Sequence, residues 1–345
     1  MADLLVLGGG PAGLAAAIHG AKIGMKVKLL ERAAGPIDKA CGEGLMPPAL
    51  RSLRNMGIGP LPGHPFVGIR YLDEQRSIEA RFDAGPGLGL RRTTLHAALH
   101  ERALTLGVEH HRGSLERWSQ DQTGVEVNGL RGSWLIAADG LHSPMRRALG
   151  LELPPRRQAR VGLRRHFSVA PWSDHVEVYW SAQAEAYVTP VTASSVGVAI
   201  LTYADRLPTG TGPAFDRLLA LFPNLASRLT KPCSEPRGAG PFEQRLRARR
   251  AGRVLLVGDA AGYLDALTGE GIRLGFDTAE AAIDCLRRDQ PGAYDRAWWR
   301  CARRYWWLTA GLLSLSRRAS LRPSLLRLLE AQPWLFRSSV NMLAR

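Results

Sequence analysis

Three glycines near the N-terminus have the spacing that a dinucleotide phosphate requires. Gly8, Gly10 and Gly13 form a GxGxxG pattern. The pattern follows a short apolar run, residues 4–7, and precedes an expected helix over residues 15–22. The first glycine permits a tight turn, the second lets a pyrophosphate approach the backbone, and the third lets the helix pack close to the strand. The free N–H groups of the helix N-terminus also attract anions. This arrangement predicts a dinucleotide site.

An acidic residue completes this unit. Glu31 ends an expected second strand over residues 27–30. A carboxylate there can accept hydrogen bonds from the two hydroxyls of an adenosine ribose, and it disfavours a 2′-phosphate. We therefore expect FAD or NAD, and not NADP, at this site. The alternative is a glycine-rich turn in another α/β fold.

The length and composition fit a reduced, cytoplasmic protein. The chain has 345 residues, enough for two linked domains or one large one. No apolar run reaches 18 residues, and the best candidate, residues 306–315, is too short to span a bilayer. No charged region precedes an apolar segment at the N-terminus, so we expect no signal peptide. The cysteines show no CxxC spacing, so no metal site is expected; they are Cys41, Cys233, Cys285 and Cys301.

The charge is strongly basic and is concentrated near the C-terminus. The formal net charge is +15, and the segment from Arg287 onward holds twelve arginines and three acidic residues. A basic face suggests an anionic partner, which could be membrane headgroups, nucleic acid or an acidic carrier protein. The other interpretation is a solvated basic surface.

The rest of the chain alternates between expected strands and helices. Residues 66–82 alternate apolar and polar side chains, which predicts two strands with a turn at 73–75. Buried strands are expected at 134–138 and 253–257, and antiparallel strands over 161–203 could form the floor of a substrate pocket. The helices expected from composition and capping lie at residues 49–56, 91–106, 212–222 and 272–286, and after residue 294 with breaks at Pro323 and Pro333.

Three separated motifs together resemble one family. They are the GGGPAG turn with Glu31, the stretch AADGLHSPMRRALGL at residues 137–151, and GRVLLVGDAAGYLDALTGEGIRLGFDTA at 252–279. The chain resembles, over residues 1–290, the FAD-dependent family that contains p-hydroxybenzoate hydroxylase-like monooxygenases, geranylgeranyl reductases and flavin-dependent halogenases. The resemblance implies an α/β fold, with FAD as the cofactor.

The same resemblance implies how the chain is divided. A Rossmann-like FAD-binding domain with a mostly parallel sheet is expected, together with an antiparallel β-sheet substrate domain and a helical C-terminal region. The expected FAD-binding segments are residues 1–65, 91–155 and 246–290. The other expected parts are substrate-domain strands at 66–90, the main substrate domain at 156–245, and the helical region at 291–345.

The resemblance also implies site residues. Arg92 would reach the phosphate or ribityl region of the flavin, and Asp259 would bond a ribityl hydroxyl. The first N–H groups of the helix after Gly269 would face the flavin pyrimidine. Asp139 and Arg146 match a motif linked to FAD and nicotinamide handling, or else form a structural turn and helix cap. The full set expected to bind the cofactor is Gly8, Gly10, Pro11, Ala12, Gly13, Glu31, Arg32, Cys41, Arg92, Asp139, Gly258, Asp259, Gly269, Glu270, Gly271 and Ile272.

Cys41 and Glu43 are the expected candidates for catalysis. The resemblance puts their loop, CGEG, beside the isoalloxazine ring. A thiol there could donate a proton to a substrate carbon opposite a hydride from flavin N5. The alternative is a small residue that packs on the flavin.

We expect an FAD-dependent oxidoreductase, and first a monooxygenase. It would use NADH or NADPH as a transient reductant and molecular oxygen to hydroxylate or epoxidise an apolar small molecule of the secondary-metabolite type, through a flavin C4a-hydroperoxide. The stretch EAYVTPV, residues 185–191, lacks the aromatic motif ending in FP that the reductases carry, and the halogenase WxWxIP signature is absent.

Two other functions also agree with parts of the sequence. A geranylgeranyl reductase-like ene reductase acting on a prenyl or polyene lipid is supported by the CGEG and LTGEGI stretches. For such a protein, the arginine- and tryptophan-rich C-terminus would suit peripheral attachment to the inner face of the membrane. The alternative, which we favour, is a helix that packs its tryptophans on the FAD-binding domain and displays its arginines to solvent. A flavoprotein that binds nucleic acid would also suit the charge, but the sequence contains no recognition motif.

Overall fold

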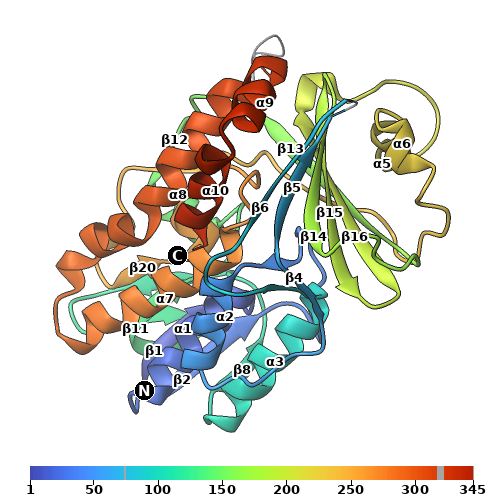
Figure 1. Ribbon diagram of the computed structural model, residues 1–345. Helices are drawn as coiled ribbons and strands as arrows, with labels where there is room; N and C mark the ends of the chain where they lie inside the picture. Colours follow the sequence, from blue (N-terminus) through green and yellow to red (C-terminus); the bar gives the residue numbers. More distant parts are fainter. Residues whose placement is uncertain (74, 317–321, 345) are drawn as a thin grey trace.

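The computed structural model of the chain describes residues 1–73, 75–316 and 322–344 (Figure 1). Two large sheets organise it, one mostly parallel and one mostly antiparallel. This mixed α/β architecture confirms the fold class that the sequence predicts. The turn expected at 73–75 includes residue 74, which lies outside the described residues.

The mostly parallel sheet carries the glycine motif. Its main strand order is β19-β20-β11-β1-β2-β8, and β1 pairs in parallel with both β2 and β11. The short strand β10 pairs antiparallel with β11, and β9 pairs antiparallel with β10. Helix α1 (Pro11–Lys22) packs on β1, β2 and β11, and every residue of β1 except Asp3 is buried, as its apolar run at residues 4–7 requires. The strands are β1 (Ala2–Leu7), β2 (Val27–Glu31), β8 (Glu109–Arg112), β9 (Trp118–Gln120), β10 (Val125–Val127), β11 (Leu130–Ala137), β19 (Arg250–Ala251) and β20 (Val254–Leu256).

Helix α1 (Pro11–Lys22) leads directly from the glycine turn and is the centre of the helical packing. It contacts α3 (Arg92–Thr105) and α7 (Gly271–Arg287). A Cβ added at Gly275 would lie 3.1 Å from Cβ of Ala12, so glycine permits the close approach of α7 to α1. Helices α2 (Pro47–Asn55) and α4 (Pro144–Ala148) complete this part.

The second sheet has the order β17-β13-β16-β15-β14-β5-β6. Every pairing is antiparallel except β14 with β5. The helix expected at 212–222 is wrong in its extent: α5 ends at Leu219, and Pro223 begins a separate short helix, because proline is favoured at a first helical position. The elements are β5 (Gly68–Leu72), β6 (Ser77–Arg81), β13 (Arg160–Phe167), β14 (His175–Trp180), β15 (Ala184–Thr192), β16 (Ser195–Tyr203), β17 (Arg237–Ala239), α5 (Ala214–Leu219) and α6 (Pro223–Ala226).

A small third sheet, β3 (Gly44–Leu45), β7 (Gly87–Gly89) and β4 (His64–Phe66), was not predicted. Glycine-rich segments are typical of loops, but here a glycine is required by tight packing. A Cβ at Gly89 would lie 1.6 Å from the carbonyl oxygen of Pro190 in β15. This sheet therefore holds the CGEG loop against the antiparallel sheet. A further pair joins β12 (Glu152–Leu153) to β18 (Arg245–Leu246).

Within residues 294–316 and 322–344, which the structure describes, the C-terminal helices are α8 (Tyr294–Ser316), α9 (Arg322–Ala331) and α10 (Pro333–Leu343). Helical breaks are predicted at Pro323 and Pro333. Pro333 is the first residue of α10, and Pro323 is the second residue of α9, so each proline lies at the start of a helix. Helix α8 packs on α7, and α10 packs on β6 (Figure 1). None of the helices in the described residues is long and apolar enough to cross a membrane. Residues 317–321 and 345 of the expected helical region lie outside the described residues.

Candidate active site

A cavity of about 950 Å³ runs from the start of α1 to the C-terminal helices. Ligand pockets commonly enclose roughly 300–1,000 Å³, so this one is large enough for more than a small substrate. One half is lined by the glycine turn and by polar side chains. The other half is lined by apolar side chains of the antiparallel sheet and of α8, α9 and α10.

The glycine turn is shaped as the motif predicts. Gly8 has a φ of +101°, and a Cβ there would lie 2.4 Å from the carbonyl oxygen of Ala138. A Cβ at Gly13 would lie 1.8 Å from the carbonyl oxygen of Gly8, so only glycine lets α1 start this close to the strand. A Cβ at Gly10 would meet no atom within 4 Å, because that side of the turn opens on the cavity.

Glu31 is fixed at the edge of the same cavity. Its Oε2 accepts a hydrogen bond from the N–H of Gly9 at 2.6 Å, and its Oε1 accepts one from the N–H of Ala33 at 2.9 Å. Nε2 of the buried His96 lies 2.9 Å from the carbonyl oxygen of Gly9. The carboxylate is therefore held in one orientation at the place where the sequence predicts an adenosine ribose.

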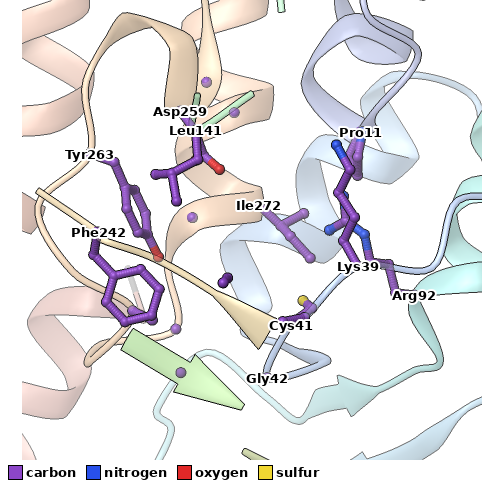
Figure 2. Close-up of a pocket in the computed structure, with 18 of the residues that line it drawn as sticks. Pro11, Lys39, Cys41, Gly42, Arg92, Leu141, Phe242, Asp259, Tyr263 and Ile272 are labelled. Carbon is purple, nitrogen blue, oxygen red and sulfur yellow. The ribbon is translucent and has the colours of Figure 1, made fainter. Parts of the chain in front are cut away.

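Two cations and one acid meet next to the glycine turn. Figure 2 shows Lys39 and Arg92 together near Pro11, the first residue of α1. Burial, assisted by the neighbouring Arg92, lowers the pKa of Lys39. Nε of Arg92 is buried and meets no hydrogen-bond partner among the described residues. Burial raises the pKa of Asp259, although Arg92 and Lys39 act against that rise. The two cations would be stabilised by a polyanion such as a pyrophosphate, and Asp259 would be stabilised by a hydroxyl group that donates to its carboxylate.

Asp139 and Arg146 have different roles. Asp139 lines the cavity, and its Oδ2 accepts a hydrogen bond from the N–H of Met145 at 2.9 Å. Arg146 is buried and donates to the carbonyl oxygens of Leu141, Asp259 and Ala260. It therefore ties the loop after β11 to the loop after β20 and does not line the cavity.

The CGEG loop is held by a buried polar network. Oε1 of Glu43 accepts a hydrogen bond from the N–H of Arg92 at 2.8 Å, and its Oε2 lies 2.5 Å from Nε2 of His166. Nδ1 of His166 lies 2.9 Å from one guanidinium nitrogen of Arg164. The other terminal nitrogen of this guanidinium forms an ion pair with Asp38. Both oxygens of this glutamate are thus engaged by protein groups. His166, Arg164 and Asp38 carry no sequence pattern that would have revealed this network.

Cys41 lies on the cavity wall, and Figure 2 shows its thiol beside Gly42. Burial raises the pKa of the Cys41 thiol, despite the opposing charge of Arg92. The backbone N–H of Glu43 lies 3.4 Å from its sulfur. The thiol is therefore kept neutral at physiological pH, a state that suits either a proton donor or a simple packing residue.

The start of α7 also reaches the cavity. Gly269, Gly271 and Ile272 line it, but the carboxylate of Glu270 is turned away and pairs with Arg273 at 2.8 Å. Of the other predicted cofactor residues, Gly13 alone does not line the cavity. The predicted site residues that the fold brings to the cavity are Gly8, Gly10, Pro11, Ala12, Glu31, Arg32, Cys41, Glu43, Arg92, Asp139, Gly258, Asp259, Gly269, Gly271 and Ile272.

The apolar half contains residues that sequence reasoning missed. Phe242 and Tyr263 stand together in Figure 2, with ring centroids 6.1 Å apart. Tyr71 packs edge-on against Phe336 of α10 at 5.2 Å, so the last helix forms part of the wall. The apolar spacing of α10 was available in the sequence, but nothing in it indicates which surface that helix covers.

The residues present fit FAD. The open side of Gly10 and the unpaired Arg92 Nε line the same cavity as Glu31, the residue predicted to bond an adenosine ribose. Fold and cavity thus define an α/β protein with a dinucleotide site that opens on an apolar chamber. Residues 1–61 and 88–283 match the family model described as FAD binding domain, and the chain belongs to this family.

Two curated relatives and one solved structure describe the neighbourhood. A menaquinone reductase of Mycobacterium tuberculosis is 27% identical over 83% of this chain and 76% of its own. A putative 2-heptyl-3-hydroxy-4(1H)-quinolone synthase of Rhodococcus erythropolis is 31% identical over 77% of this chain and 74% of its own. A flavoprotein/dehydrogenase structure from Cytophaga hutchinsonii superposes with a TM-score of 0.86, at 19% identity over 99% of this chain and 92% of that one. The predicted superfamily is confirmed, and the chain is an FAD-dependent oxidoreductase.

Proposed function

We propose that the protein is a monooxygenase that oxidises an apolar molecule with an aromatic or polar head, using NADH or NADPH as reductant. The observation that carries this proposal is the continuity of the dinucleotide cradle with an apolar chamber closed by the antiparallel sheet and the C-terminal helices. Such a chamber excludes water from the reaction, which protects a reactive oxidising group. Bound FAD would supply electron transfer from the nicotinamide and the activation of oxygen.

The chain's own residues would bind and orient. Lys39 and Arg92 would hold the phosphates, and Asp259 would accept a ribityl hydroxyl bond. The N–H groups of Gly271 and Ile272 at the start of α7 would favour negative charge on the reduced ring. The neutral thiol of Cys41 would pack against that ring.

The name of the quinolone synthase relative supports an aromatic substrate that carries an alkyl chain. The chamber offers aromatic rings to the head group of such a substrate, from Tyr71, Phe242 and Tyr263. For the alkyl tail it offers aliphatic side chains of α8, α9 and α10, including Leu312, Leu329 and Leu343. Aromatic rings stack favourably on one another.

A second candidate is an ene reductase that saturates a prenyl chain. The likeness to menaquinone reductase supports it, and so does the half-buried, neutral thiol of Cys41 on the cavity wall, which could protonate a substrate carbon. In that reaction Cys41 would be a catalytic acid, whereas oxygen transfer needs no acid at this position.

Product analysis separates the two reactions. Purified holoprotein is supplied with NADH or NADPH under isotopically labelled dioxygen, together with long-chain alkylphenols, alkylquinolones and menaquinone. We expect a product that gains one labelled oxygen atom and a Cys41→Ala variant that retains most of this turnover. A product that gains two hydrogen atoms without oxygen, formed anaerobically and lost in Cys41→Ala, would establish the reductase.

A further inference from the structure

We propose that the outer face of α8 docks the protein on an anionic lipid bilayer. This tryptophan–arginine face consists of Arg296, Trp299, Arg300, Arg303, Arg304 and Trp307, all of them exposed. Residues 299, 303 and 307 are four apart and therefore share one side of the helix. Trp307 is 79% exposed and Trp299 is 41% exposed, which is unusual for the largest apolar side chain.

The face carries positive charge that no acid in the described part of the chain pairs with. Among the described residues, none of its four arginines forms an ion pair. The neighbouring Asp295 is engaged elsewhere, since its Oδ1 accepts a hydrogen bond from the N–H of Arg249 at 3.0 Å. Four guanidinium groups therefore project into solvent on one side of a single helix. An anionic surface complements them, because each arginine near such a surface strengthens binding.

The tryptophans favour a bilayer over other anionic partners. Indole rings concentrate at membrane interfaces, where the ring meets apolar chains and its N–H meets water. Further apolar side chains are exposed on the two following helices, namely Leu328 at 51%, Trp334 at 61% and Met342 at 46%. An acidic protein or a nucleic acid would satisfy the arginines but would offer no apolar layer to the exposed rings of Trp299 and Trp307.

The face lies on the outside of the cavity wall, on a helix whose inner side is anchored to the core. On its inner side, α8 is anchored where the hydroxyl of Tyr305 accepts from the N–H of Leu264 and donates to the carbonyl oxygen of Asp265 at 2.8 Å. Arg249 stacks on the buried Trp298 at 4.1 Å. Leu308 and Leu312 of the same helix line the apolar chamber. Docking through this face would bring the chamber next to the lipid from which an apolar substrate arrives; that last step rests on the proposed function.

Vesicle flotation of the holoprotein tests the docking without reference to turnover. We expect the wild type to float at low salt with vesicles of phosphatidylglycerol and phosphatidylcholine, to be released by high salt, and to stay unbound with phosphatidylcholine alone. Changing Arg296, Arg300, Arg303 and Arg304 to Gln should weaken vesicle binding by about a hundredfold or more. Trp307→Ser should weaken it severalfold without changing its salt dependence.

A matched variant controls for net charge. Arg54, Arg117, Arg156 and Lys231 are also exposed and outside any ion pair among the described residues. Their replacement by Gln removes the same charge and should leave flotation nearly intact. Equal loss in both variants would overturn the proposal, as would an unbound wild type or a wild type that binds tRNA tightly while ignoring vesicles. FAD content and the melting temperature verify that each variant is folded. Vesicle binding without oxygen transfer would refute the proposed function and leave the docking intact.

Discussion

Glu43 provides the sharpest test of how the CGEG loop, residues 41–44, is held. It is 3% exposed and has a φ of +58°, and its two carboxylate oxygens engage the N–H of Arg92 and the imidazole of His166. Glu43→Ala leaves two buried polar groups without a partner. Each such group costs about 1–3 kcal/mol, so we expect a loss of about 2–6 kcal/mol in the free energy of unfolding.

The left-handed backbone at this position adds an internal check. Alanine keeps the strain of a positive φ, whereas glycine relieves about 1 kcal/mol of it. Glu43→Gly should therefore be about 1 kcal/mol more stable than Glu43→Ala, although it removes the same hydrogen bonds. Glu43→Gln retains one acceptor and should lose the least.

Denaturant unfolding of the three apoprotein variants measures these differences, and FAD titration measures their effect on the site. We expect FAD affinity to fall in the order of stability, because the loop that carries Cys41 also lines the cofactor cavity. Our reasoning would be refuted if Glu43→Gln kept full stability and FAD affinity while losing turnover. That result would make Glu43 a chemical participant and not a positioning residue.

Three further predictions follow from single residues. A Cβ at Gly10 meets only open space, so the Gly10→Ala apoprotein should have the melting temperature of the wild-type apoprotein but should no longer bind FAD. A Cβ at Gly13 would lie 1.8 Å from a carbonyl oxygen, so Gly13→Ala should lose both FAD binding and stability. Equal melting temperatures of the two variant apoproteins would contradict this. Burial raises the pKa of Asp265 from 3.8 to about 6, so the folded chain retains a proton there that the unfolded chain releases. This residue's contribution to stability should therefore fall by about 3 kcal/mol between pH 4 and 6, and Asp265→Asn should remove that decline from denaturant curves collected across this range. Burial also raises the pKa of the Cys41 thiol, so iodoacetamide should alkylate Cys41 more slowly than the exposed Cys233 at pH 8, as peptide mapping would reveal; faster labelling of Cys41 would indicate an activated thiolate.

The polar half of the site was largely predictable because its chemistry depends on neighbours in sequence. Gly8, Gly10 and Gly13 act within one turn, and Glu31 lies at the end of the next strand. Asp259 follows a buried apolar strand, where a carboxylate is costly without a ligand. Such local patterns fix the β1–α1–β2 unit and the strand ends that meet at one edge of a parallel sheet. The expected division into domains stays a prediction.

Only the tertiary structure decided which distant groups meet. His166 reaches Glu43 across 123 positions of the chain, and no periodicity encodes such a pair. The carboxylate of Glu270 turns to Arg273 and away from the cavity, because one turn of helix brings them together and burial demands a partner. The last helix closes the apolar chamber through Phe336, a contact set by how α10 packs on β6. Sequence patterns specify which surfaces need cover, but packing of the whole chain determines which elements cover them.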